Sequence, residues 1–288
     1  MTISGNAIVA GVMGWPVAHS LSPRVHGYWL RRYGIDGAYI PMAVPPSDIA
    51  DALRALPKLG LSGCNVTVPH KEAALACVDE VSDIARRIGA VNTIVVRSNG
   101  ALFGTNTDVD GFRNNILAAV PGWNAADGPA VVLGAGGAAR AVVAALVDDG
   151  CPEVHVVNRT ANRAERLAKD VGGPVFAHAW SENADAMDGA AIAVNTTTLG
   201  MTNQPPLNVD IAALPLSAVV ADIVYSPLRT AFMTGASDRG NTVVGGLGML
   251  LHQARPGFAA WFGVEPDVTD ELEAFVRKAV GDRWSFSA

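Results

Sequence analysis

VVLGAGGAARAVVAAL, residues 131–146, reads as a buried strand, a glycine-rich turn and a helix. The turn carries Gly134, Gly136 and Ala139 in the spacing G-x-G-x-x-A. Gly134 permits a tight turn, Gly136 lets an anion approach the amides at the helix N-terminus, and Ala139 lets the helix lie close to the sheet. In this strand–turn–helix context the spacing predicts a dinucleotide-binding unit, although an ordinary glycine-rich turn remains the alternative. The residues predicted to line the dinucleotide are Gly134, Ala135, Gly136, Gly137 and Ala138.

The next strand, EVHVVNR (153–159), indicates which dinucleotide binds. A protein that binds NAD tends to end this strand in an acidic residue, which binds the ribose 2′-hydroxyl and repels a 2′-phosphate. Asn158 occupies that place, and Arg159, Thr160 and Arg163 follow it. Arginine pairs with phosphate through two hydrogen bonds, so these four residues favour NADP(H). The alternative is a helix start with exposed arginines.

Strand-like and helix-like segments alternate along the chain, which is typical of an α/β protein with a mostly parallel sheet and some antiparallel pairing. The predicted strands are 8–14, 38–44, 64–68, a hairpin pair within 91–106, 130–135, 153–159, 191–197, 218–225 and 241–246. The predicted helices are 23–33, 46–56, about 70–77, about 81–87, the stretch after the glycine turn, the stretch from about 248, and 270–280. Asn99-Gly100 predicts a two-residue hairpin turn, and a second unit is expected to start near Asp110.

Composition excludes several classes of protein. The 288 residues are half hydrophobic and only 17% charged, so one or two domains with a large core are expected. A net charge of −6 argues against a general nucleic-acid binder. Cys64, Cys77 and Cys151 are too few for a disulfide framework, and no CxxC pair suggests a metal. With no recognisable signal peptide or membrane span, the sequence predicts a cytoplasmic protein.

The strand CNVTV (64–68) has an unusually polar face for a strand in an α/β domain. Alternation places Asn65 and Thr67 on one face and predicts that Val66 and Val68 lie in the core. A proline then ends the strand, and Lys71 stands on the first turn of the following helix. The amide of Asn65, the hydroxyl of Thr67 and the amine of Lys71 can therefore all point in the same direction.

Nine segments together resemble the shikimate dehydrogenase family, in the family's order and over nearly the whole chain. They are 14–26 (GWPVAHSLSPRVH), 62–72 (SGCNVTVPHKE), 89–94 (GAVNTI), 104–112 (GTNTDVDGF), 134–140 (GAGGAAR), 158–160 (NRT), 195–201 (NTTTLGM), 222–230 (DIVYSPLRT) and 245–254 (GGLGMLLHQA). The resemblance implies reversible NADPH-dependent reduction of 3-dehydroshikimate to shikimate in aromatic amino-acid biosynthesis. It also implies an N-terminal α/β substrate domain (1–109 and 247–288), a Rossmann-like NADP-binding domain (110–246), and C-terminal helices that return to the first domain.

The resemblance also implies roles for single residues. Reduction of a ketone needs a proton donor at its oxygen, and the family's proton-transfer pair corresponds to Lys71 and Asp108. The residues implied to bind the substrate carboxylate are Ser20, Ser22 and Tyr225. Those implied to bind its hydroxyl or carboxylate side are Asn65, Thr67 and Asn92, with Gln253 as a further hydroxyl partner. Thr196, Ile223 and Gly246 are implied to complete the cofactor site.

Several of these residues have a plain structural alternative. Ser22 fits the N-cap of the helix that begins at Pro23. Tyr225 also fits a core aromatic with a solvated hydroxyl, and Asn92 fits a side chain that ties down backbone. Lys71 and Asp108 fit an ordinary salt bridge.

Three other functions remain alternatives: a quinate/shikimate dehydrogenase with relaxed substrate or cofactor choice, a methylenetetrahydrofolate dehydrogenase, and a non-catalytic NADPH-binding sensor. The expected partner is a small-molecule substrate, with no nucleic acid, membrane or metal, and a homodimer is left open.

Overall fold

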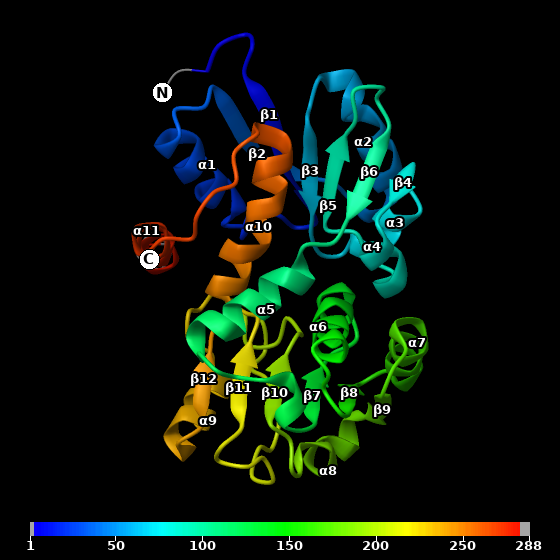
Figure 1. Ribbon diagram of the computed structural model, residues 1–288, viewed down its shortest axis with the longest axis vertical. Helices are drawn as coiled ribbons and strands as arrows, with labels where there is room; N and C mark the ends of the chain where they lie inside the picture. The colour runs from blue at the N-terminus through cyan, green and yellow to red at the C-terminus, as the bar shows by residue number, and fades with distance from the viewer. Residues whose placement is uncertain (1–2, 283–288) are drawn as a thin grey trace. The chain divides into compact units, whose positions relative to one another are not determined.

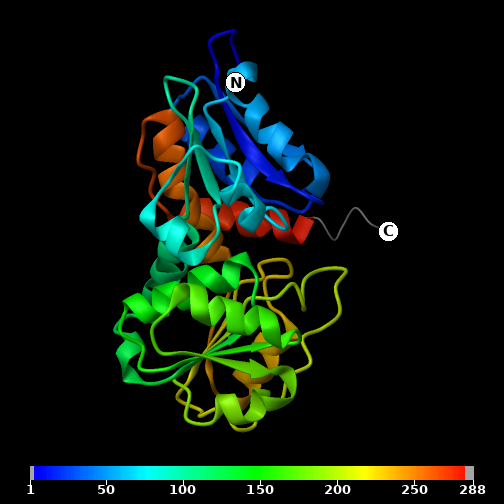
Figure 2. The ribbon, with the colours of Figure 1, turned by 90° about the vertical axis from the view of Figure 1, so that its right-hand side faces the viewer.

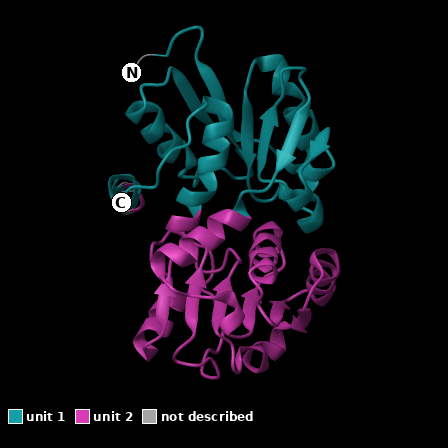
Figure 3. Cartoon of the chain, viewed as in Figure 1, with its two compact units in different colours: residues 1–108, 250–278 teal, residues 109–249, 279–288 magenta. Residues whose placement is uncertain are grey.

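The computed structural model describes residues 3–282, which form two compact units (Figures 1 and 3). Unit 1 comprises the described residues up to Asp108 together with Leu250–Lys278. Unit 2 comprises Val109–Met249 and the described residues after Lys278. Each unit is built on its own six-stranded sheet with helices packed on it. The predicted α/β class with two units is confirmed.

The sheet of unit 1 mixes parallel and antiparallel pairs in the strand order β2-β1-β3-β5-β6-β4. Its strands are β1 (Ile8–Gly14), β2 (Gly37–Ala43), β3 (Gly63–Val66), β4 (Glu80–Val81), β5 (Thr93–Val96) and β6 (Leu102–Thr105). Strand β1 pairs in parallel with β2 and β3, whereas β5 is antiparallel to both β3 and β6. The antiparallel pair is the predicted hairpin within residues 91–106.

The helices of unit 1 come from two separate parts of the chain. They are α1 (Ser22–Arg32), α2 (Ile49–Ala55), α3 (Lys71–Leu75) and α4 (Asp83–Ile88), with 3₁₀ turns η1 (Pro46–Asp48) and η2 (Pro57–Leu59), and then α10 (Leu247–Phe262) and α11 (Asp270–Asp282). The Trp261 indole of α10 donates to the carbonyl of Ile94 in β5 at 3.0 Å. The rings of Trp29 in α1 and Phe258 in α10 are fully buried and lie 5.3 Å apart. The C-terminal helices therefore complete the core of unit 1.

The prediction that Val68 lies in the core is wrong. Strand β3 ends at Val66, which is buried, and Val68 is 53% exposed. The Thr67 N–H still donates to Met13 at 2.8 Å, so the chain leaves the sheet directly after this residue. Period-two alternation does not apply beyond that point.

The predicted two-residue turn at Asn99-Gly100 is also wrong by one position. The Gly100 N–H donates to the Arg97 carbonyl at 2.9 Å, so Ser98 and Asn99 are the central residues of the turn. Gly100 follows with a φ of 83°, as in a three-residue hairpin loop that ends in a left-handed residue.

Unit 2 is a doubly wound sheet in which all strands are parallel, in the order β12-β11-β10-β7-β8-β9. Its strands are β7 (Ala130–Leu133), β8 (Val154–Asn158), β9 (Val175–Ala179), β10 (Ile192–Asn195), β11 (Val219–Asp222) and β12 (Thr242–Val244). The strand order reverses between β7 and β10, which is the position where open α/β sheets bind ligands. Edge strand β9, which the sequence analysis did not predict, is only partly buried.

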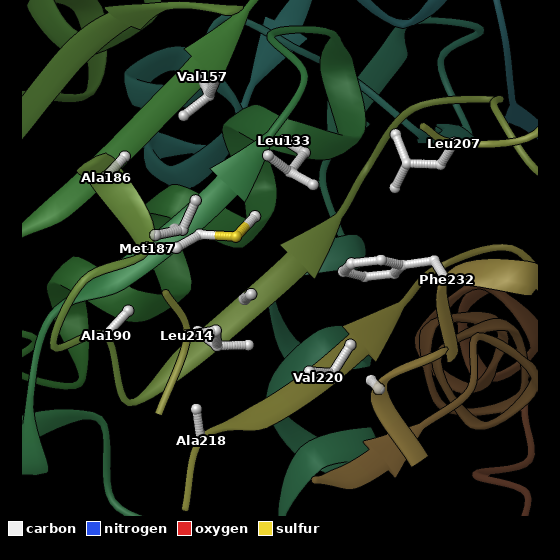
Figure 4. Packing of buried hydrophobic residues seen from close by; sticks show 13 residues of the cluster. Leu133, Val157, Ala186, Met187, Ala190, Leu207, Leu214, Ala218, Val220 and Phe232 are labelled. Atoms are coloured by element: carbon white, nitrogen blue, oxygen red, sulfur yellow. The ribbon is translucent and has the colours of Figure 1, made fainter. Parts of the chain in front are cut away.

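Helices cover both faces of this sheet (Figure 2). They are α5 (Asp108–Ala119), α6 (Gly137–Asp148), α7 (Ala161–Val171), α8 (Asn183–Met187) and α9 (Ala231–Arg239), with 3₁₀ turns η3 (Ala125–Asp127) and η4 (Trp180–Glu182). On one face Leu133, Val157 and Val220 of the strands pack with Met187 of α8 and Phe232 of α9 (Figure 4). This core holds the ends of β7, β8 and β10 in place.

Gly63 fixes the close pairing of β3 with β5, and substitution tests that constraint. Its φ is 150°, and a Cβ would overlap the Ile94 carbonyl oxygen and the Trp261 indole nitrogen. We expect Gly63→Ala to lower the free energy of unfolding, measured in urea, by more than about 3 kcal/mol. Gly60→Ala is the control, because Gly60 also has a positive φ but faces open space. It should cost about 1 kcal/mol. Equal losses in the two variants would contradict the close-pairing argument.

Candidate active site

Lys71 and Asp108 meet in unit 1 although 37 residues separate them in sequence. Each is the first residue of a helix, α3 and α5 respectively. The Lys71 Nζ lies 2.5 Å from Asp108 Oδ2, and the two side chains are only 14% and 6% exposed. The sequence prediction that these two residues are brought together is correct. A short, largely desolvated ammonium–carboxylate contact is suited to holding a proton at a defined position.

Backbone contacts hold both members of this pair. The Asp108 N–H donates to Asn106 Oδ1 at 2.9 Å, and Asn106 Nδ2 donates to the Ala90 carbonyl at 3.1 Å. The Lys71 carbonyl accepts from the Val91 N–H at 2.8 Å. Residues 90–91 therefore anchor Lys71 directly and Asp108 through the buried Asn106.

Asn65 and Asn92 lie in one buried polar network beside this pair. Asn65 Nδ2 donates to Thr93 Oγ1 at 3.0 Å, and Thr93 Oγ1 donates to Asn92 Oδ1 at 2.9 Å. Asn92 Oδ1 also accepts the N–H of Thr107 at 2.9 Å, next to Asp108 in sequence. The prediction that the Asn92 side chain ties down backbone is thus confirmed. Thr67, just beyond β3, is half-buried.

Ser20, Ser22 and Gln253 are the other predicted substrate residues of unit 1. Ser22 is the first residue of α1, and Leu21 is its N-cap, so the N-cap alternative for Ser22 is wrong. The Ser22 N–H donates to Ser20 Oγ at 3.3 Å, which places the two serines together. Gln253 of α10 is buried, and its Nε2 donates to the Leu250 carbonyl at 3.0 Å.

The glycine turn of unit 2 has the geometry that a pyrophosphate needs. Gly134 has a φ of 109°, and a Cβ on it would lie 2.8 Å from Thr196 Oγ1, so only glycine fits there. Gly136 is the N-cap of α6, and a Cβ on it would meet open space. Ala135 and Ala139 are buried, and Gly137 and Ala138 form the first turn of α6. The free amides at this helix start face the open side of the turn, which fits an anionic dinucleotide.

The end of β8 carries no acidic side chain. Asn158 ends the strand, and its Nδ2 donates to the Thr160 carbonyl at 2.9 Å. Thr160 is the N-cap of α7, whose first turn contains Arg163. Arg159, Thr160 and Arg163 are all exposed. An exposed pair of arginines around a helix start fits the 2′-phosphate of NADP(H).

Ile223, Tyr225 and Gly246 lie in unit 2, after the ends of β11 and β12. The Ile223 N–H donates to the Asn195 carbonyl at 3.1 Å, and the Gly246 N–H donates to the Val224 carbonyl at 3.3 Å. A Cβ at Gly246 would overlap the Ile223 carbonyl oxygen. Thr196 Oγ1 donates to the Leu133 carbonyl at 2.7 Å, so Thr196 ties β10 to the glycine turn.

Asp222 holds the loop after β11, and the sequence analysis missed it. It is fully buried at the end of β11, and its carboxylate accepts from Asn195 Nδ2 at 3.0 Å, the Val224 N–H at 2.9 Å and Thr230 Oγ1 at 2.8 Å. These bonds tie both ends of the loop that carries Ile223 and Tyr225. A lone aspartate inside the apolar run AVVADIVY was the available signal.

Neither a metal cluster nor a membrane-spanning helix is found within residues 3–282. In that range, no three His, Cys, Asp or Glu side chains are placed to share a metal ion. No helix of the same range is both long and apolar enough to cross a bilayer.

The fold and the site together define a pyridine-nucleotide-dependent oxidoreductase. Residues 12–94 match the family model of the shikimate dehydrogenase substrate binding domain, and residues 118–212 match that of shikimate / quinate 5-dehydrogenase. The chain belongs to the shikimate dehydrogenase family, and it is an NADP-dependent oxidoreductase.

Relatives agree with this assignment over nearly their whole length. The shikimate dehydrogenase (NADP(+)) of Paramagnetospirillum magneticum is 58% identical over 274 residues, which are 95% of this chain and 99% of the relative. The structure of shikimate 5-dehydrogenase from Thermus thermophilus in complex with NADP(H) and shikimate has a TM-score of 0.79 at 37% identity, covering 96% of this chain and 99% of that one. Quinate dehydrogenase from Corynebacterium glutamicum in complex with NAD has a TM-score of 0.85 at 31% identity, covering 93% and 98%.

Asp222 predicts a pH dependence of stability. Burial raises the pKa of Asp222 from 3.8 to about 6, although hydrogen bonds from Val224, Thr230 and Asn195 oppose the rise. The folded protein thus keeps a proton that the unfolded chain releases, so this group's contribution to stability falls as pH rises from about 4 to about 6 and is constant above. The loss amounts to roughly 3 kcal/mol.

We expect the free energy of unfolding of the wild type, relative to Asp222→Asn, to decline over that interval in urea titrations followed by circular dichroism. The substitution itself removes acceptor bonds, but that offset does not depend on pH. Parallel pH profiles of the two proteins would show that Asp222 does not titrate as described.

Proposed function

We propose that the chain catalyses the reversible NADPH-dependent reduction of 3-dehydroshikimate to shikimate, with Lys71 and Asp108 transferring the proton. The observation that carries this proposal is the desolvated 2.5 Å contact between Lys71 Nζ and Asp108 Oδ2. An ordinary surface salt bridge gains little stability, and a buried one costs desolvation energy. A buried pair set beside a network of neutral hydrogen-bonding groups is therefore better explained by chemistry than by stability.

Lys71 supplies the proton in the reductive direction. As the substrate ketone oxygen gains negative charge, the Lys71 ammonium donates a proton to it, and Asp108 holds the amine in place. In the oxidative direction the lysine–aspartate pair takes up the proton of the substrate hydroxyl. General acid–base help of this kind contributes on the order of 10²–10⁴ in rate.

The remaining polar groups of unit 1 suit a small polyhydroxylated acid. Ser20 and Ser22 lie together at the start of α1, where two neighbouring hydroxyls are suited to bind a carboxylate. Tyr225 of unit 2 is assigned to the same carboxylate by the family resemblance. Four residues are assigned to the hydroxyl or carboxylate side: Asn65, Thr67, Asn92 and Gln253.

The dinucleotide is assigned to the end of the unit 2 sheet at the strand-order switch. The amides of Gly136 and the following residues would bind its pyrophosphate, and Arg159, Thr160 and Arg163 its 2′-phosphate. Asn158, Thr196, Ile223 and Gly246 would complete this site. When bound, NADPH supplies the hydride of the reaction. In this assignment substrate and proton chemistry belong mainly to residues 1–109 and 247–288, and cofactor binding to residues 110–246.

The cytoplasmic location stays a prediction, and a homodimer stays open. The small-molecule substrate is supported by the Thermus thermophilus relative, whose structure holds shikimate and NADP(H).

A turnover assay with shikimate and quinate, each with NADP⁺ and NAD⁺, tests the proposed reaction through the absorbance of the reduced cofactor. We expect shikimate with NADP⁺ to be the best pair, with NADPH bound at least ~10-fold tighter than NADH because the two arginines pair with the 2′-phosphate. Arg159→Ala should weaken NADPH more than NADH. Arg166→Ala, an exposed arginine further along α7, is the control.

Other outcomes of this assay favour named alternatives. Quinate with NAD⁺ as the best pair would favour the activity of the Corynebacterium glutamicum relative. Tight NADPH binding without turnover of either acid would favour a sensor.

Lys71→Ala tests the proton donor. We expect kcat to fall at least ~10²-fold with a much smaller change in the KM for shikimate, because the variant still binds the acid but cannot protonate it. Steady-state kinetics measure both constants. Lys58→Ala, an exposed lysine of the same unit, should leave both unchanged. A Lys71→Ala enzyme that retains most of its kcat would remove Lys71 from the chemistry.

A further inference from the structure

An unbroken line of five side-chain hydrogen bonds crosses unit 1 from Tyr39 to Gln253. Tyr39 Oη lies 2.6 Å from Asn65 Oδ1, and the contacts from Asn65 to Thr93 and from Thr93 to Asn92 follow. Asn92 Nδ2 then lies 3.0 Å from Thr107 Oγ1, and Thr107 Oγ1 lies 2.8 Å from the Gln253 carbonyl oxygen. All six residues are buried. Three of them, Asn65, Asn92 and Gln253, are assigned to the substrate.

Backbone groups force the direction of every bond in this line. The Gln253 carbonyl only accepts, so Thr107 donates to it. The Thr107 N–H only donates, so the Asn92 atom 2.9 Å from it must be oxygen.

The same argument applies to Asn65. The Asn92 carbonyl only accepts, so the Asn65 atom 3.2 Å from it must be nitrogen. Asn65 Oδ1 therefore faces Tyr39, and the Tyr39 hydroxyl must donate. All five donors point from Tyr39 toward Gln253.

This direction decides what Asn65 and Asn92 offer to a ligand. Both amide hydrogens of Asn65 are used, by the Asn92 carbonyl and by Thr93, so Asn65 offers only an acceptor. Asn92 Oδ1 is occupied by the Thr107 N–H and the Thr93 hydroxyl, whereas one Nδ2 hydrogen remains for a ligand. One asparagine thus accepts from a substrate hydroxyl and the other donates to one.

Tyr39 is held so that it remains a donor. Its ring stacks on His26 at 3.8 Å between centroids, with the planes 1° apart. Burial raises the pKa of Tyr39 well above its ordinary value, whereas a hydrogen bond from Ser22 opposes the rise. The phenol consequently keeps its proton at any working pH.

We propose that Tyr39 is a positioning residue for the substrate: its hydroxyl fixes the Asn65 amide so that Oδ1 accepts from a substrate hydroxyl. This inference rests on the proposed binding of shikimate by Asn65. Without the phenol oxygen, Asn65 Oδ1 loses its donor inside the protein, and only the two bonds of Nδ2 hold the amide. Tyr39 itself is not assigned to contact the substrate.

Tyr39→Phe removes the donor and keeps the ring. We expect the KM for shikimate to rise about 3- to 10-fold, the effect of one neutral hydrogen bond, with kcat changed less. Asn65→Ala should raise KM at least as much. The double variant should match Asn65→Ala alone, because the proposed effect of the hydroxyl passes through Asn65. A further rise in KM would place the effect at Ser22, which also hydrogen-bonds the phenol, and would overturn the inference.

Tyr33→Phe is the matched control, because the Tyr33 ring packs on Phe258 in the same unit and its oxygen accepts a 3.4 Å bond from the Asp267 N–H. It should leave KM unchanged. An unchanged KM in Tyr39→Phe, or effects of the two substitutions that multiply in the double variant, would overturn the inference while leaving the reaction intact. If Asn65→Ala leaves KM unchanged, Asn65 does not bind substrate and the inference falls with it. Loss of the proposed function would instead appear as no wild-type turnover of shikimate.

Discussion

A carbonyl oxygen accepts hydrogen bonds and cannot donate them, and unit 1 is organised around this asymmetry. The carbonyls of Gln253 and Asn92, with the Thr107 N–H, leave one arrangement for the polar side chains between β2 and α10. Every donor in that line except one Asn92 Nδ2 hydrogen has an acceptor, so a polar network inside an apolar core carries no large desolvation penalty. The last side-chain donor of the line is Thr107, the residue before Asp108, so the hydrogen-bonding groups and the proton pair share one stretch of backbone.

In unit 2 a single buried carboxylate organises the polar groups around it. The Asp222 carboxylate gathers three donors at the end of β11, and two of them lie in the loop that follows. Close backbone packing adds to this, because Gly246 leaves no space for a side chain against Ile223. These contacts hold the loop after β11 against the carboxyl end of the sheet.

The sequence predicted most of this fold and part of the site. Hydrophobic runs located ten of the twelve strands, and the G-x-G-x-x-A spacing identified the cofactor turn. Lys71 and Asp108 were paired through family resemblance, because no periodicity relates residues so far apart. Edge strands β4 and β9 were missed, since β4 has only two residues and the VFAHA sequence of β9 is short and only partly buried. Val68 was misplaced because alternation cannot show where a strand ends.

Other site residues carry no signal of their own in the sequence. Tyr39 sits in the apolar segment AYIPMAV, where a tyrosine is an ordinary strand residue. Thr93 and Thr107 stand inside the motifs GAVNTI and GTNTDVDGF, yet only their contacts show that they orient Asn65 and Asn92. Their importance lies in the direction of hydrogen bonds, which depends on tertiary neighbours.

The origin of unit 1 from two distant parts of the chain has a consequence for synthesis on the ribosome. Its sheet is complete by residue 105, but Phe258 and Trp261, which pack against Trp29 and β5, are translated only after nearly all of unit 2. Until then the apolar surface of unit 1 that packs against α10 stays exposed to solvent. The sheet of unit 2, by contrast, is continuous in sequence and able to fold as it emerges. The nascent chain is thus most vulnerable to aggregation at the half that it translates first.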